Sequence, residues 1–201
     1  MRRSLLLRSH IRRRPVGAGA GYPVSGSLLH SKPFYADQVG IPTATHPVTA
    51  IAPSDLDNLY NDLVICEFDD TIEQGRTFKD RVPDAANFVL DAGTVDFEIV
   101  GKPNAAPAGN RNVRWELNYR NIDNNGALGA WAALTLGDMV IPANTNFQYS
   151  VFSLVIGAGA GELDVTPGNH VEFELVRIAP AADNLTGDLH FYAITPFWFA
   201  V

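Results

Sequence analysis

Two stretches of this sequence alternate strictly between apolar and polar residues, and a period of two is the pattern of a β-strand with one buried face. In VRWELNYR (113–120), Val, Trp, Leu and Tyr share one face, and Arg, Glu, Asn and Arg share the other. In HVEFELVR (170–177), Val, Phe and Leu lie opposite His and two Glu residues. Each stretch is therefore predicted to be a half-buried strand.

Further strands are predicted where β-branched, aromatic or alternating residues gather between turn signals. They cover 63–68, 76–82, 94–101, 147–156 and 188–201. The last of these is expected to break near Pro196, because proline lacks the N–H that a ladder needs. Turns are expected at DNNG (123–126), TPGN (166–169) and 179–187. Roughly eight strands with no long helix predict an all-β fold, a β-sandwich of jelly-roll type.

Charge is distributed unevenly along the chain. Residues 1–54 contain seven basic residues and one acidic residue, whereas residues 55–201 contain eight basic and 21 acidic residues. The first segment has prolines throughout and no clear periodicity, so it is predicted to be an extended arm that gains order from a partner. At the boundary, residues 53–62 predict a single helical turn capped by Ser54. The predicted organisation is a basic docking arm, 1–54, followed by a β-sandwich domain, 55–201.

Six arginines at the start of the arm are the predicted partner-binding residues: Arg2, Arg3, Arg8, Arg12, Arg13 and Arg14. Arginine binds carboxylates through two parallel hydrogen bonds, so this segment is expected to recognise an acidic protein surface. The same Arg-rich, acid-poor composition is also typical of a mitochondrial transit peptide. Nucleic-acid binding is a rival use, disfavoured because the acidic body would repel phosphate. No membrane partner is expected, since no apolar run approaches the roughly 20 residues of a membrane helix.

Sequence motifs of catalysis are missing, and no catalytic, cofactor-binding or metal-ligating residue is predicted. The glycine-rich stretch 155–162 is not followed by a helix, which a dinucleotide-binding loop requires. The five histidines form no zinc motif. Glu67, Asp69, Asp70 and Glu73 could bind calcium through oxygen atoms, but they lack the spacing of an EF-hand, so a solvated acidic loop is the favoured interpretation. We expect a protein that is not an enzyme.

Residues 113–201 resemble a β-sandwich module found in structural proteins of tailed bacteriophages. The resemblance lies in a Trp-bearing strand, a strand of the pattern hydrophobic-x-Phe-x-hydrophobic-x-Arg, and a D-x-L-x-G-D turn before a final strand. Trp115 occupies the first element, and Asn169 stands before the second, where the module usually has Asp. The second is filled by Val171, Phe173, Leu175 and Arg177, and the third by Asp183, Leu185, Gly187 and Asp188.

The resemblance implies a virion protein, since such modules occur in capsid decoration (cement) proteins, head fibres and tail fibres or spikes, usually as trimers. The leading interpretation is a cement protein on the capsid surface, whose arm binds the major capsid protein and neighbouring virion subunits. Phe197, Trp198 and Phe199 are expected at a homotrimer interface, because neighbours on a strand alternate faces and cannot all enter one core. The alternative is a tail-fibre or tailspike module that binds host carbohydrate on an aromatic shelf at Trp131 or Trp198. A tailspike depolymerase is disfavoured, since no long repeat is present.

Overall fold

The computed structural model describes residues 27–35, 39, 58–60, 63–84, 93–145, 148–178 and 184–200. Within these ranges the protein is all-β, and no helix is long and apolar enough to cross a membrane. One sheet has seven strands: β1 (Ser27–Ser31), β2 (Phe34–Tyr35), β3 (Asn58–Tyr60), β4 (Leu63–Phe68), β6 (Thr94–Pro103), β9 (Gln148–Val155) and β11 (Leu189–Ala200). The other has four: β5 (Gln74–Arg81), β7 (Arg111–Ile122), β8 (Ala132–Ile141) and β10 (His170–Arg177).

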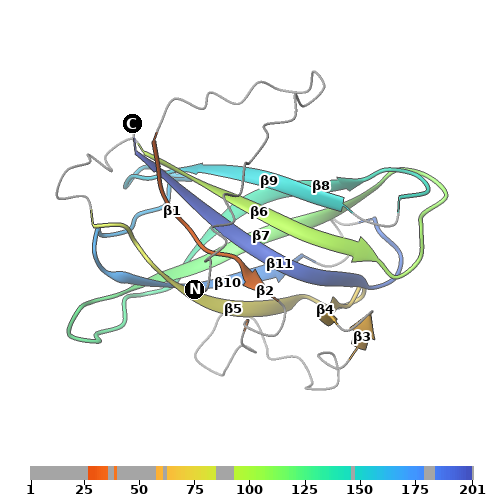
Figure 1. Cartoon of the computed structure of the whole chain (residues 1–201), viewed down its shortest axis with the longest axis horizontal. Coiled ribbons are helices and arrows are strands. Elements are labelled where there is room, and N and C mark those ends of the chain that lie inside the picture. The colour runs from red at the N-terminus through yellow and green to blue at the C-terminus, as the bar shows by residue number, and fades with distance from the viewer. Residues whose placement is uncertain are drawn as a thin grey trace, which may run out of the picture.

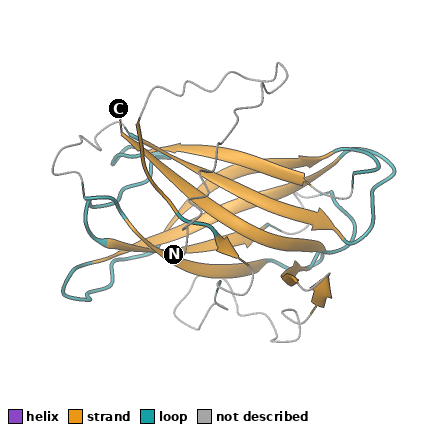
Figure 2. Cartoon of the chain, viewed as in Figure 1, coloured by secondary structure: helices purple, strands orange, loops and turns teal. Residues whose placement is uncertain are grey.

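The strands from β4 to β11 pair like one long hairpin. β7 pairs with β8, β6 with β9, β5 with β10 and β4 with β11, always antiparallel. The pairs fall alternately into the two sheets, whose orders are β4-β11-β6-β9 and β5-β10-β7-β8. This is the strand order of a jelly roll, so the predicted fold class is confirmed. Figure 1 shows β6 and β11 passing across β7 and β10, and Figure 2 shows only strands and loops in the described chain.

Aromatic side chains from both sheets meet in the core. The ring centroid of Phe173 on β10 lies 5.0 Å from that of Phe78 on β5 and 5.3 Å from that of Phe97 on β6, across the sandwich. Trp115 on β7 is fully buried and packs edge-on against Phe68, with centroids 5.1 Å apart. The apolar positions of the two alternating stretches are all buried. Both stretches are therefore confirmed as strands with one face in the core.

Strand β8 is the long strand that the sequence pattern did not predict. Its sequence, AALTLGDMVI, begins with alanines and contains Gly137, so neither bulk nor alternation marks it. Gly137 has φ 122° and pairs with Trp115, while Thr135 pairs with Glu116. The residue between them forms a bulge, which shifts the side-chain alternation partway along the strand.

Two local predictions are wrong. Residues 58–60, expected in a helical turn, form β3 instead; Ser54 lies outside the described residues. Strand β11 does not break at Pro196. Pro196 lies between the part of β11 that pairs with β2 and the part that pairs with β1. Neither β1 nor β2 pairs with residue 196, so the missing N–H of proline costs no pairing on that side of β11. The irregularity of β11 falls earlier, between Phe191 and Ala193.

Part of the predicted arm belongs to the seven-stranded sheet. β1 pairs with the end of β11, from Phe197 to Ala200, and β2 pairs with Ala193 and Ile194. Phe34 of β2 is buried, and its ring centroid lies 5.0 Å from that of Phe78 on β5. Residues 27–35 therefore join the arm to the sandwich, and Val39 is also buried. The other residues of 1–54 lie outside the described residues.

Candidate functional site

Three carboxylates meet where β4 ends and β11 begins. Leu189 of β11 pairs with Phe68 of β4 in antiparallel register, so the residue before Leu189 lies next to the residue after Phe68. One carboxylate oxygen from each of Asp69, Asp70 and Asp188 lies within 4.8 Å of the others. We call these three residues the acidic corner. The sequence pattern missed Asp188 as a member, because only the pairing of two distant strands brings it there.

The two glutamates of the predicted acidic cluster have other positions. Glu67 forms an ion pair with His190, with 3.2 Å between Oε1 and Nε2. Glu73 is exposed, and its negative charge adds to burial in raising the pKa of Glu116 on β7. The structure therefore brings together two of the four predicted carboxylates and adds a third from β11.

Within the acidic corner, the surroundings stabilise the ionised form of Asp69 and destabilise the ionised form of Asp188. Asp69 Oδ1 accepts hydrogen bonds from the backbone N–H and the hydroxyl of Thr71, at 2.6 and 2.5 Å. The hydroxyl bond is the main reason that the pKa of Asp69 is lowered. Burial raises the pKa of Asp188, and the charges of Asp69, Glu67 and Asp70 raise it further. Asp188 is therefore the carboxylate of the acidic corner whose ionised form the neighbouring negative charges disfavour.

Arg177 supplies the positive charge behind the acidic corner. It lies at the end of β10, and its side chain is fully buried. Its guanidinium donates to the carbonyl oxygens of Phe68 at 2.7 Å, Leu185 at 3.0 Å and Gly187 at 3.2 Å. Its charge also lowers the pKa of Asp69 and opposes the rise at Asp188. One side chain thus ties β10, the end of β4 and the turn before β11 together.

Two of the motifs that carry the phage resemblance meet at Arg177, which binds the carbonyls of Leu185 and Gly187. Leu185 of the D-x-L-x-G-D turn is buried. Gly187 has φ 96°, and a Cβ there would lie 2.8 Å from Asn104 Oδ1, so the turn requires glycine. Its N–H donates to Asp70 Oδ2 at 2.5 Å. The arginine of one motif thus binds the backbone of the other; Asp183 lies outside the described residues.

Carboxylate oxygens are the ligands that calcium prefers. Within the described chain the cluster contains only these three carboxylates, and Asp69 and Asp70 already accept hydrogen bonds from the protein. We interpret the hydrogen bonds of Arg177 and the one from Gly187 N–H to Asp70 as a latch between the end of β4 and the turn before β11. Asp69, Asp70 and Asp188 are each partly exposed, and residues 69–73 form the loop between β4 and β5.

Replacing Asp188 with asparagine is expected to raise the melting temperature at neutral pH and to lose this effect in acid. The pKa of Asp188 is raised above 3.8, so the fold disfavours the ionised carboxylate. That unfavourable contribution is present at about pH 7 and disappears as both states become protonated, at about pH 3.5. Thermal unfolding at both pH values measures it. An equal gain at both pH values would contradict this reading, and Asp84→Asn, at an exposed carboxylate, is the control.

The other residues predicted as sites fall into three groups. Arg2, Arg3, Arg8, Arg12, Arg13 and Arg14 lie outside the described residues. Trp198 is fully buried in its own sandwich and donates through Nε1 to Asp80 Oδ2 at 2.9 Å, so it is neither an exposed shelf nor an accessible interface residue. Phe197 and Phe199 are half-buried on the opposite, outer face of β11. Trp131 is half-buried, and its ring lies 4.6 Å from the Arg120 guanidinium.

Two exposed tyrosines lie on the outer face of the seven-stranded sheet. Tyr35 of β2 pairs with Ala193 of β11, Ala193 with Val100 of β6, and Val100 with Tyr149 of β9. We call this set the tyrosine row; it spans roughly 14 Å across four strands. Tyr35 is 53% exposed and Tyr149 is 55% exposed. Tyr149 also lines a shallow groove of about 410 Å³ with Gln148 and Asp138. The sequence indicated neither tyrosine as a site, since pairing between distant strands creates the row.

Comparisons with known proteins find similarity only between structures. No family model and no curated protein matches the sequence. A CBM35 module from Cellvibrio japonicus is 10% identical with a TM-score of 0.42, and the match covers 83% of this chain and 92% of that one. The xylan-binding CBM22-1 domain from Paenibacillus barcinonensis is 9% identical with a TM-score of 0.38, over 88% of this chain and 97% of that one. The assignment of a β-sandwich rests on the two sheets described above.

Proposed function

We propose that this protein is a non-enzymatic structural protein of a tailed-phage particle, a decoration protein on the capsid surface. The observation that carries the proposal is the anchoring of the arm. A basic arm can link the sandwich domain to neighbouring subunits only if the end of the arm next to the domain is fixed to it. Strands β1 and β2 make that tie, because they extend the seven-stranded sheet and bury Phe34. Twelve residues separate Arg14 from Ser27, the first residue of β1.

The electrostatics of the chain suit this role. The six arginines of residues 1–54 all lie within the first 14 residues, whereas residues 55–201 contain eight basic and 21 acidic residues. The arginines of the arm therefore favour carboxylates on the major capsid protein or on neighbouring copies as partners, and the acidic body disfavours a nucleic-acid partner. Arg177, a motif residue of the phage resemblance, serves the fold by holding three backbone carbonyls. That role fits a structural module and requires no reaction chemistry.

The proposal is tested by adding labelled full-length protein to capsids assembled without it and measuring occupancy after sedimentation. We expect saturable binding and, by electron microscopy, density on the outer capsid surface. The proposal would be contradicted if the protein bound isolated tails or host envelope polysaccharide and did not bind the capsids.

The proposal includes a homotrimer formed through the outer face of β11. Phe197 and Phe199 are half-buried there, beside Leu28 of β1, which is 53% exposed. Apolar side chains gathered on one outer face gain from cover by a partner. Light scattering of the full chain at micromolar concentration is expected to give three times the monomer mass. A monomeric wild-type protein would argue against the homotrimer. A trimer whose mass does not change on the Phe197→Ser substitution would argue against this interface.

Carbohydrate binding is the second candidate function, and the tyrosine row favours it. The ring of a tyrosine offers an apolar face with a polar hydroxyl at its edge, and the side chains of Tyr35 and Tyr149 are both exposed on the outer face of the sheet. Tyr149→Ala is expected to weaken binding to host envelope polysaccharide about fivefold to tenfold, the value of one stacked ring. Calorimetric titration measures the change. Val155→Ala, at another exposed position on β9, is the matched control. If wild-type protein shows no binding, this second function is wrong.

A further inference from the structure

A buried carboxylate joins β5 to both β1 and β11. Asp80 of β5 is 5% exposed. Its Oδ2 accepts a hydrogen bond from Trp198 Nε1 at 2.9 Å, and its Oδ1 accepts one from the Arg81 backbone N–H at 2.8 Å. The same Oδ1 lies 3.3 Å from Nε2 of His30 on β1. Asp80 therefore provides a polar contact between the N-terminal segment and the four-stranded sheet, in addition to the apolar contact between Phe34 and Phe78.

Of these three partners, His30 alone can become positively charged, since the indole and the backbone amide are neutral donors. A carboxylate in a protein interior is costly unless an opposite charge compensates it. Histidine changes its charge between about pH 5 and pH 8. The His30 side chain is 40% exposed, so protons reach it from solvent. Gaining a proton converts a neutral contact with Asp80 into a charge-assisted hydrogen bond.

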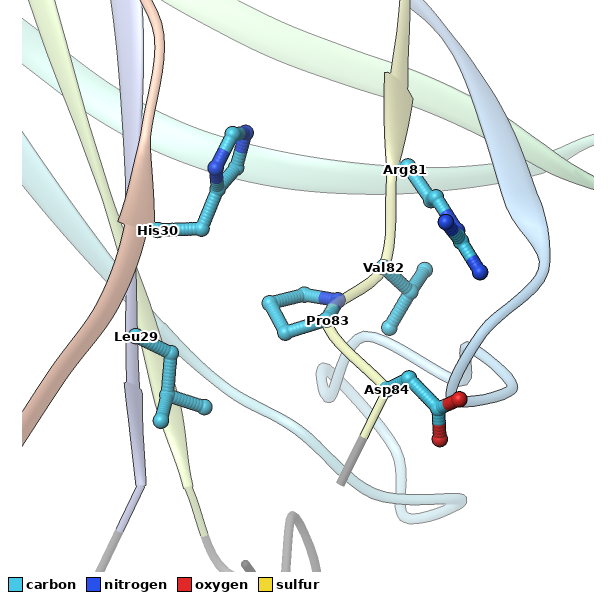
Figure 3. A pocket seen from close by; sticks show the side chains of 6 residues that line it. All are labelled: Leu29, His30, Arg81, Val82, Pro83 and Asp84. Atoms are coloured by element: carbon cyan, nitrogen blue, oxygen red, sulfur yellow. The ribbon is translucent and has the colours of Figure 1, made fainter. Parts of the chain in front are cut away.

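Two other charged residues, Arg81 and Asp84, line the groove beside His30. The groove has a volume of about 440 Å³ and is lined by Leu29, His30, Arg81, Val82, Pro83 and Asp84. Figure 3 shows His30 and Leu29 on one wall, facing the Val82–Pro83 wall, with the Arg81 side chain directed away from His30. Arg81 Nε donates to the carbonyl of Gly168 at 3.3 Å. On the segment of His30 itself, Lys32 Nζ lies over the Phe34 ring. Among the residues that the structure describes, Asp80 is thus the charged group in direct contact with His30.

We propose that His30 and Asp80 form a pH-sensitive clasp that fixes residues 27–35 to the sandwich. Protonation of His30 closes the clasp, and deprotonation loosens β1 from the edge of β11. The opening is confined to this segment. β1 has a register shift between Leu28 and His30, and β2 is only two residues long, whereas the opposite side of β11 stays paired with β6 over most of its length. The clasp goes beyond the proposed function, because it controls how firmly the arm is anchored whatever the arm binds.

Hydrogen exchange of the full chain at about pH 5.5 and pH 8 tests the clasp. Protection factors, corrected for the intrinsic exchange rate at each pH, are compared for the amides of β1 and of β6. We expect β1 protection to fall about fivefold to tenfold at the higher pH, the effect of one half-exposed charge-assisted hydrogen bond. Protection of β6 is expected to stay constant. Equal protection of β1 at both pH values overturns the proposal.

Two variants and a matched control assign the effect. His30→Gln removes the charge, and Asp80→Asn keeps an acceptor for Trp198; each is expected to make β1 protection independent of pH. If Asp80→Asn does not fold, His30→Gln decides alone. His190→Gln is the control, because His190 pairs with Glu67 elsewhere in the same sheet at a similar distance. A pH effect that survives His30→Gln, or that disappears in His190→Gln, contradicts the clasp.

Discussion

Replacing Arg177 with alanine is expected to lower the free energy of unfolding by about 4 kcal/mol, a large part of the roughly 5–15 kcal/mol that stabilises a typical domain. The substitution leaves three backbone carbonyls without their buried donor: those of Phe68, Leu185 and Gly187. It also removes the positive charge that lowers the pKa of Asp69 and limits the rise at Asp188. The carboxylates of the acidic corner would then repel one another without compensation.

Urea unfolding followed by tryptophan fluorescence measures this change. Arg177→Lys keeps the charge but cannot present a planar fork to three carbonyls, so an intermediate loss is expected. Arg114→Ala is the matched control: Arg114 lies on the outer face of β7, its side chain is partly exposed and, among the described residues, it pairs with Asp138, so its loss should change stability little. If Arg177→Ala is as stable as Arg114→Ala, the latch at the acidic corner contributes no net stability.

Deleting residues 1–14 is expected to reduce capsid occupancy at least about tenfold while leaving the melting temperature unchanged. The deletion removes all six arginines of the arm and ends twelve residues before β1, so the contacts of β1, β2 and Phe34 remain. Each arginine that pairs with a carboxylate contributes little alone, but several per arm in an oligomer bind with high avidity.

Occupancy of capsids assembled without the protein is the measurement, with circular dichroism melting as the test of the fold. A variant with all six arginines changed to lysine keeps the charge and loses the paired hydrogen bonds, so it should fall between intact and truncated protein. Equal occupancy of truncated and intact protein would show that the sandwich docks by itself. A large drop in melting temperature would show that residues 1–14 belong to the fold.

The fold was predictable from sequence to the extent that side-chain alternation reports a strand. The stretches 113–120 and 170–177 alternate because one face of each strand lies in the apolar core, whereas the other face carries polar side chains, several of which are also buried. Strand β8 was missed because alanines, Gly137 and a bulge erase that pattern. Strands β1 and β2 were missed because they are short edge strands, stabilised by β11 across more than 150 residues of chain.

The candidate sites were less predictable, because distant pairings create them. Asp69 and Asp70 stood out as a cluster, but Asp188 joins them only through the register of β4 and β11. Trp198 looked like a surface aromatic between two phenylalanines, yet alternation places it in the core, where Asp80 accepts its N–H. No local pattern identifies Asp80, since its neighbours are a lysine and an arginine.

The position of β11 in the chain has a consequence for how the protein is made. β11 pairs with β1, β2, β4 and β6, and all four precede it in the sequence. During synthesis the four-stranded sheet can close as soon as β10 has left the ribosome, but the larger sheet then holds only its β3–β4 and β6–β9 pairs. One edge of β4 and one edge of β6 remain unpaired until β11 forms hydrogen bonds with both strands. The nascent chain therefore passes through a stage in which the unpaired edges of β4 and β6 can pair with strands of neighbouring chains.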